Sequence, residues 1–77
     1  MPTYKLYINP MCPFCQKVLM FMDENKVELP LANINEGSNL DDLRTIGGSG
    51  QVPALLIDDK MMYESDDIIA YIRENIL

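Results

Sequence analysis

Apolar and polar residues alternate along residues 3–9, and this pattern predicts a β-strand. One face would carry Tyr4, Leu6 and Ile8, and the other face Lys5 and Tyr7. The spacing then changes to that of a helix from Pro13 to about Glu24, which should end near residues 25–26. The apolar side of this helix is expected to contain Phe14, Val18, Phe21 and Met22.

A second strand is predicted over residues 27–34, followed by a short helix. Pro30 has no N–H to donate to a ladder, so this strand should lie at a sheet edge. Ser38 or Asn39 should cap the helix, and the glycine-rich residues 47–50 should end it. Its buried side is expected to contain Leu40, Leu43 and Ile46.

The last third of the chain predicts a β-hairpin and a final helix. Strands over residues 54–57 and 61–63 would flank a tight turn at residues 58–60. Ser65 is expected to cap the helix, with Asp66 and Asp67 in its first turn, where the helix dipole favours negative charge. The apolar stripe of this helix would contain Ile68, Ile69, Ile72 and Ile76.

The predicted order of elements is therefore β-α-β-α-β-β-α. A strand–helix–strand unit favours parallel strands and a right-handed crossover, whereas a hairpin is antiparallel. The expected fold class is α/β, with a mixed four-stranded sheet covered by three helices. Residues 1–77 contain no repeat, linker or low-complexity segment, so we expect a single domain.

Composition narrows the choice of partners. Of the 77 residues, 48% are apolar, which is enough for a packed core. The net charge of −6 disfavours nucleic acid, because no basic patch could displace counterions from phosphates. It also disfavours anionic membranes, and no segment approaches the ~20 apolar residues of a membrane span. We expect a soluble, cytoplasmic monomer.

The two cysteines of the chain lie together as Cys12-Pro13-Phe14-Cys15, at the predicted start of the first helix. Two thiols at this spacing can close into a disulfide and reopen without unfolding the chain. A helix N-terminus offers free N–H groups, which lower the pKa of a thiol from its usual value near ~8.5. Proline is tolerated at the first helical position, which supports this placement. We therefore interpret the pair as a redox site in a reducing compartment.

Three other roles for the cysteine pair are less favoured. A structural disulfide would close a loop of a few residues and constrain little. A zinc site would lack two ligands, because the chain has no histidine and no third cysteine, so no metal is expected. Two buried core thiols would not explain why Pro13 stands at the start of the helix.

Two more segments each have a plain and a functional interpretation. Gln51-Val52-Pro53 precedes a strand, so Pro53 is either an ordinary strand-start proline or a cis proline facing Cys12. Ser65-Asp66 is either an ordinary helix cap or an anion site, because a helix N-terminus offers N–H groups to a carboxylate. The residues alone leave both questions open.

The order Cys-Pro-Phe-Cys, Gln-Val-Pro and Glu-Ser-Asp, at these separations, resembles the glutaredoxin family over essentially the whole chain. The segments Gly50-Gln51-Val52-Pro53-Ala54-Leu55 and Tyr63-Glu64-Ser65-Asp66 are also similar to the N-terminal, thioredoxin-fold half of glutathione transferases. The resemblance implies a thioredoxin-like fold and an active-site turn at Pro13 and Phe14. It also implies that Cys12 is the nucleophile and Cys15 the resolving thiol.

The resemblance further implies a binding site for glutathione. Pro53 would be cis, and the backbone of Val52 would pair with the cysteine of glutathione. Ser65 and the helix amides would take the γ-glutamyl carboxylate, and Asp66 would take the ammonium group. Glutaredoxins often have a basic residue where this chain has Asn9, and paired glycines where it has Tyr63-Glu64. Without that basic residue, the candidates for holding the glycine carboxylate are Gln51, Lys17 and Arg44.

The function implied is that of a glutathione-dependent dithiol oxidoreductase, acting in electron transport and cell redox homeostasis. Its partners would be glutathione and disulfide-bearing or glutathionylated proteins. One alternative is a redoxin that a flavoprotein reductase reduces. Another is an iron–sulfur carrier, with Cys12 from two protomers and two glutathiones as ligands. A glutathione transferase is less expected, because the chain ends after the third predicted helix.

Overall fold

The computed structural model describes residues 2–77 and shows the predicted order of strands and helices. The strands are β1 (Tyr4–Ile8), β2 (Leu31–Asn33), β3 (Ala54–Ile57) and β4 (Lys60–Tyr63). The helices are α1 (Pro13–Glu24), α2 (Asn39–Gly47) and α3 (Ser65–Asn75). The differences from the sequence-based expectation lie in where some elements begin and end.

The four strands form one sheet in the order β2-β1-β3-β4. β1 is parallel to β2 and antiparallel to β3, and β3 is antiparallel to β4. Leu6 marks the register at the centre, because it lies opposite Leu31 of β2 and Leu55 of β3. The predicted mixed sheet and the α/β class are confirmed.

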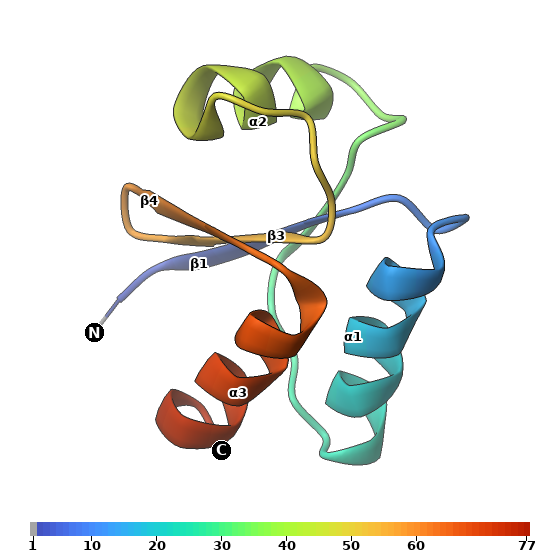
Figure 1. Cartoon of the computed structure of the whole chain (residues 1–77), viewed down its shortest axis with the longest axis vertical. Helices are drawn as coiled ribbons and strands as arrows, with labels where there is room; N and C mark the ends of the chain where they lie inside the picture. Colours follow the sequence, from blue (N-terminus) through green and yellow to red (C-terminus); the bar gives the residue numbers. More distant parts are fainter. Residues whose placement is uncertain (1) are drawn as a thin grey trace.

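The helices form two layers on the sheet (Figure 1). α1 and α3 lie side by side on one face, and α2 covers the other. Successive residues of β1 supply both layers: Leu6 and Ile8 pack in the core beneath α1 and α3, and Tyr7 packs in the core beneath α2. Burying an apolar side chain of this size contributes roughly 1.5–3 kcal/mol, so the alternation along β1 secures both layers.

The second strand is shorter than predicted. β2 contains only Leu31–Asn33, and residues 27–30 have no regular secondary structure. Lys26 has a positive φ of 56°, and the N–H of Val27 donates to the carbonyl of Met22 instead of to a strand. Pro30 lacks an N–H, but its carbonyl accepts a hydrogen bond from Leu6 at 2.9 Å. The expected edge position of this segment is confirmed.

Some apolar side chains expected to be buried are exposed. Phe14 is 62% exposed, because the buried side of α1 runs through Cys15, Val18 and Met22 instead. Ile46 is 46% exposed, because Leu43 alone in α2 is completely buried. Both predictions were wrong for the same reason. Helical spacing identifies the apolar side of a helix, but it does not show how much of that side the sheet covers.

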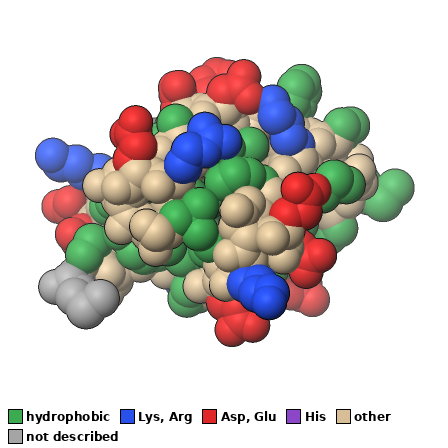
Figure 2. Space-filling model, turned by 90° about the horizontal axis from the view of Figure 1, so that it is seen from below, with side chains coloured by type: hydrophobic (Ala, Val, Ile, Leu, Met, Phe, Trp, Pro, Cys, Tyr) green, Lys and Arg blue, Asp and Glu red, His purple; other side chains and the backbone are tan. Residues whose placement is uncertain are grey.

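Part of the apolar surface therefore remains outside the core. On the face shown in Figure 2, exposed apolar side chains lie between acidic and basic ones. Within residues 2–77, no helix has both the length and the apolar character needed to cross a membrane.

Candidate active site

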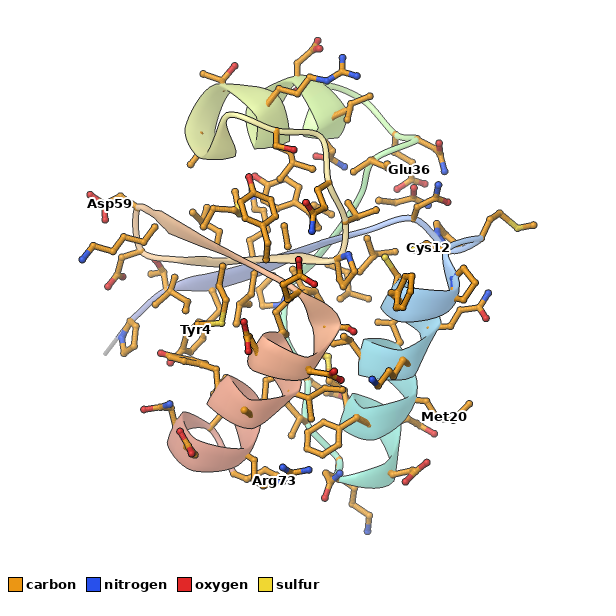
Figure 3. The ribbon with its side chains drawn as sticks, viewed as in Figure 1. Tyr4, Cys12, Met20, Glu36, Asp59 and Arg73 are labelled. Atoms are coloured by element: carbon orange, nitrogen blue, oxygen red, sulfur yellow. The ribbon has the colours of Figure 1, made fainter. Side chains whose placement is uncertain are left out.

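Cys12 occupies the N-cap position of α1, where the chain leaves β1 (Figure 3). Its backbone is extended (φ −86°, ψ 122°), and Pro13 begins the helix. The carbonyl of Cys12 accepts the first helical hydrogen bond, from Gln16 at 3.0 Å. No side chain caps this helix end with a hydrogen bond. The sulfur of Cys12 therefore stands where the oxygen of a capping serine or aspartate would be.

This position makes the Cys12 thiol acidic. The backbone N–H of Cys15 is the main cause, and it lowers the pKa of Cys12 by donating to its thiolate. Partial burial opposes this effect, whereas the thiol of Cys15 and the N–H of Phe14 lower the pKa further. The structure thus places the thiol whose pKa is lowered at this helix start.

Cys15 has the opposite character. It is completely buried in the core beneath α1, and its burial raises the pKa of its thiol to about 11. The backbone N–H of Asn9 donates to its sulfur at 3.4 Å and moderates this effect. The site therefore pairs one half-buried, acidic thiol with one buried, neutral thiol.

The loop before β3 brings a third segment to the cysteines. The Val52–Pro53 peptide bond is cis, which decides between the two interpretations of Pro53. The thiol of Cys12 lies 4.0 Å from the carbonyl oxygen of Val52. The N–H of Val52 makes no hydrogen bond with any residue of the described chain, 2–77. The loop thus presents an unpaired backbone donor beside Cys12.

A cleft of about 330 Å³ opens beside this loop. It brings together the first two turns of α1, the cis-proline loop and the start of α3. Its walls contain Phe14, Lys17, Gln51, Val52, Pro53, Glu64, Ser65 and Asp66. All five residues that the resemblance assigns to glutathione binding therefore line one cleft, although they come from two separate segments.

The start of α3 differs from the prediction in one respect. The helix begins at Ser65, and the capping position belongs to Glu64, which has a positive φ of 73°. Because Ser65 is already helical, it does not act as the cap, and its hydroxyl makes no hydrogen bond within residues 2–77. The first helical hydrogen bond runs from Ile68 to Glu64, which leaves the preceding N–H groups free. These groups and the Ser65 hydroxyl suit an anion.

Two lining residues were not assigned to this end of the cleft from the sequence. Glu64 accepts a hydrogen bond from Gln51 at 3.3 Å across the cleft. Lys17 forms an ion pair with Asp66, from α1 to α3. Glu64 could have been found from its place in the Glu-Ser-Asp motif, whereas the pairing of Lys17 carries no sequence signal. Arg44 is absent from the cleft walls and lies against Gly50 instead.

A larger groove of about 690 Å³ adjoins this cleft between α1 and α3. Lys17 and Asp66 form part of both cavities, so their ion pair lies on the boundary. The remaining walls of the groove include apolar side chains of both helices, namely Met20, Phe21 and Ile69. The smaller cleft is the candidate site because it contains the cis-proline loop that touches Cys12.

Comparison with known proteins places the chain in a family. The sequence profile described as "Glutathione S-transferase, N-terminal domain" matches residues 6–76. The chain belongs to this family. Glutathione S-transferase DHAR3 of Arabidopsis thaliana, a chloroplast protein, is 33% identical over 63 residues, which are 82% of this chain and 24% of that protein. DHAR2 of the same plant is 32% identical, and the match covers 30% of its length. The chain thus spans less than a third of these transferases.

Solved structures extend the similarity to glutaredoxins. Glutaredoxin 2 of Salmonella typhimurium, crystallised with glutathione, is 30% identical with a TM-score of 0.76, covering 99% of this chain and 34% of that protein. A glutaredoxin from Archaeoglobus fulgidus is 26% identical with a TM-score of 0.69, covering 95% and 88%. The fold of this transferase N-terminal domain is therefore thioredoxin-like, and both resemblances found in the sequence are confirmed.

Proposed function

We propose that the protein is a glutathione-dependent thiol–disulfide oxidoreductase. The observation that carries this proposal is the contrast between the two thiols, one acidic and accessible and the other buried with a pKa of about 11. We propose glutathione as the small thiol that reduces the protein. The cleft beside Cys12 supports this choice, and so does the similarity of the chain to a glutaredoxin that was crystallised with glutathione. Disulfide-bearing or glutathionylated proteins are the proposed substrates.

The reaction begins with attack of the Cys12 thiolate on the glutathione sulfur of a mixed disulfide. An S–S bond forms between Cys12 and glutathione, and the substrate leaves as a thiolate. A second glutathione thiolate then attacks the glutathione sulfur, which yields glutathione disulfide and restores the Cys12 thiolate. For a protein disulfide, Cys12 first forms a mixed disulfide with the substrate. Cys15 then loses its proton and attacks the sulfur of Cys12, which forms a Cys12–Cys15 disulfide and releases the substrate as a thiolate. Two glutathione molecules reduce this disulfide and leave as glutathione disulfide. Exchange is favoured when the attacking thiol has a pKa near the ambient pH.

The cleft provides a place for each part of glutathione. The free N–H and the carbonyl of Val52 would pair with its cysteine residue. The hydroxyl of Ser65 and the free N–H groups of α3 would take the γ-glutamyl carboxylate, and Asp66 would take the ammonium group. Gln51 is the proposed partner of the glycine carboxylate, because Arg44 lies outside the cleft walls.

Family membership favours a second candidate, glutathione transfer to an electrophile, because the matching plant proteins are named transferases. The two reactions use different nucleophiles. In disulfide exchange Cys12 must attack, whereas in transfer the attacking sulfur belongs to glutathione. Cys12 is therefore required only for the first.

The deciding experiment compares the wild type with Cys12→Ser in three assays. The first follows reduction of a glutathionylated peptide, with glutathione, glutathione reductase and NADPH. The second replaces glutathione and its reductase by thioredoxin reductase, and the third follows conjugation of glutathione to an aryl halide. We expect wild-type activity in the first assay and its loss in Cys12→Ser. Activity in the second alone would establish a flavoprotein-dependent redoxin, and conjugation that survives in Cys12→Ser would establish a transferase.

A further inference from the structure

The ion pair between Lys17 and Asp66 contributes little to the stability of the fold. The side chains are 50% and 81% exposed, and theirs is the one ion pair found among residues 2–77. Exposed pairs of this kind contribute at most about 1 kcal/mol, because water and salt screen them. Both residues nevertheless line the cleft, and Lys17 supplies the one positive charge in its walls.

Next to this pair lies a set of hydrogen-bond donors without partners. Ser65 is only 8% exposed, yet its hydroxyl is unbonded within the described residues. The N–H groups that precede Ile68 at the start of α3 are also unpaired there. Lys17 thus holds a positive charge at the end of α3 that carries the positive pole of the helix dipole. Asp66 offsets this charge in the free protein, and an anionic group placed between Lys17 and the start of α3 would interact with both.

This end of the cleft therefore contains the carboxylate of Asp66, the ammonium group of Lys17 and several anion-binding donors, together with Glu64, whose carboxylate already accepts a hydrogen bond from Gln51. Its complement is a group that carries an ammonium and a carboxylate on one carbon, which is the α-amino-acid end of a γ-glutamyl residue. Building on the glutathione-dependent function proposed above, we propose that Lys17 binds the γ-glutamyl α-carboxylate while Asp66 binds the neighbouring ammonium. Lys17 is then a specificity-determining residue for γ-glutamyl thiols and does not hold the glycine carboxylate.

The ion pair between Lys17 and Asp66 in the free protein fits this proposal, because a bound γ-glutamyl group would replace each residue as the partner of the other. Before binding, Lys17 and Asp66 neutralise each other. On binding, each residue exchanges its partner for the oppositely charged group of the ligand, so no charge in the cleft loses its counterpart. Both side chains are largely exposed beforehand, so binding removes water from them, and the two new ion pairs with the ligand offset that cost. The α-carboxylate also comes to lie between Lys17 and the N–H groups of α3.

The test measures KM and kcat for a peptide joined by a disulfide to one of four thiols. These are glutathione, its analogue without the γ-glutamyl amino group, its analogue without the α-carboxylate, and γ-glutamylcysteine, which lacks glycine. Lys17→Met keeps the length of the side chain and removes its charge. We expect it to raise KM about tenfold, with kcat nearly unchanged, for all thiols that retain the α-carboxylate. For the analogue without the α-carboxylate, KM should change less than about twofold.

Two further variants complete the design. Asp66→Asn should show the reverse selectivity, because it should raise KM only for thiols that retain the amino group. Lys17→Arg should keep most of the affinity, which separates charge from packing. The matched control is Lys60→Met, since Lys60 is next to Asp59 in the hairpin, far from Cys12 (Figure 3). It should leave all four substrates unchanged.

Three results would overturn the proposal while leaving the oxidoreductase function in place. The first is a Lys17→Met effect of equal size on all four thiols, which would place Lys17 at the Cys12 thiolate. The second is an effect that disappears with γ-glutamylcysteine, which would assign Lys17 to the glycine end. The third is the absence of any effect. If the wild type fails to act on the glutathione mixed disulfide, both the function and this proposal are wrong.

Discussion

The thiol of Cys12 lies 4.0 Å from the carbonyl oxygen of Val52, a residue 40 positions further along the chain. This contact joins the start of α1 to the cis-proline loop. In the proposed reaction, a disulfide bound at Cys12 would lie beside the backbone of Val52, whose N–H is unpaired within residues 2–77. The same backbone that borders the nucleophile can thus orient the disulfide it attacks.

Cys12 should be alkylated well before Cys15 in the reduced protein. Its pKa is lowered from the ordinary thiol value by the N–H groups at the helix start, whereas the pKa of Cys15 is raised to about 11 by burial. Cys12 therefore carries far more thiolate than Cys15 at mildly acidic pH. Brief treatment with iodoacetamide at pH values from 5 to 9, followed by peptide mass spectrometry, measures both rates. First labelling of Cys15 would reverse the two roles.

Cys15→Ser should keep the removal of glutathione from a mixed disulfide but lose reduction of protein disulfides. The reason is that a second glutathione can release glutathione from Cys12 without a resolving thiol. We expect the first rate to stay within about threefold, because Cys15 contributes only part of the lowering of the Cys12 pKa. Parallel assays with a glutathionylated peptide and a disulfide-containing protein measure the two activities. The mechanism is wrong if this variant is inactive in both while Cys12→Ser is active.

Asp66→Ala should weaken glutathione use much more than it weakens the fold. A hydrogen bond to the γ-glutamyl ammonium would contribute ~1.5–3 kcal/mol, whereas a carboxylate in an exposed first helical turn contributes ~0.3–1 kcal/mol. KM for glutathione should therefore rise about tenfold or more, with a small fall in melting temperature. Kinetics and thermal melting of the same preparation separate the two effects. Unchanged kinetics would favour a redoxin that makes no use of this corner of the cleft.

Gly47→Ala should destabilise the protein without changing the chemistry of the cysteines. A Cβ atom at this position would overlap the hydroxyl oxygen of Tyr63, which donates to the carbonyl of Gly47 at 2.9 Å. We expect a loss of roughly 1–3 kcal/mol in the free energy of unfolding, as for other overpacked sites. Urea denaturation measures it. Tyr63→Phe, which removes only the hydroxyl, should cost about 1 kcal/mol and is the matched control.

Short sequence patterns predicted a strand or a helix start correctly where the pattern fits only one local structure. The alternation of Leu6, Tyr7 and Ile8 placed β1 between two cores because successive side chains point to opposite faces. The Cys-Pro-Phe-Cys order placed a cysteine at a helix start because proline fits the first helical position. These inferences needed only near neighbours.

The features that the sequence did not predict depend on contacts between residues far apart in the chain or on backbone angles that short sequence segments do not reveal. The exposure of Phe14 depends on where the sheet ends beneath α1, and the start of α3 depends on the positive φ of Glu64. The ion pair between Lys17 and Asp66 joins residues 49 positions apart, so only the packing of α1 beside α3 creates it. The cis form of Pro53 was implied by the resemblance and not by the local sequence, because most X–Pro bonds are trans, and the structure shows it.

The place of Cys12 at the head of α1 has a consequence for the oxidised protein. Closing a disulfide to Cys15 would remove the negative charge that faces the free N–H groups of the helix. The oxidised form should therefore unfold at a lower urea concentration than the reduced form near neutral pH, which paired denaturation curves would show. In a thermodynamic cycle, that difference appears as a higher reduction potential, at about 30 mV for each 1.4 kcal/mol. The peptide dipoles of this helix thus make the Cys12–Cys15 disulfide of the folded protein a stronger oxidant than the same disulfide in an unfolded chain.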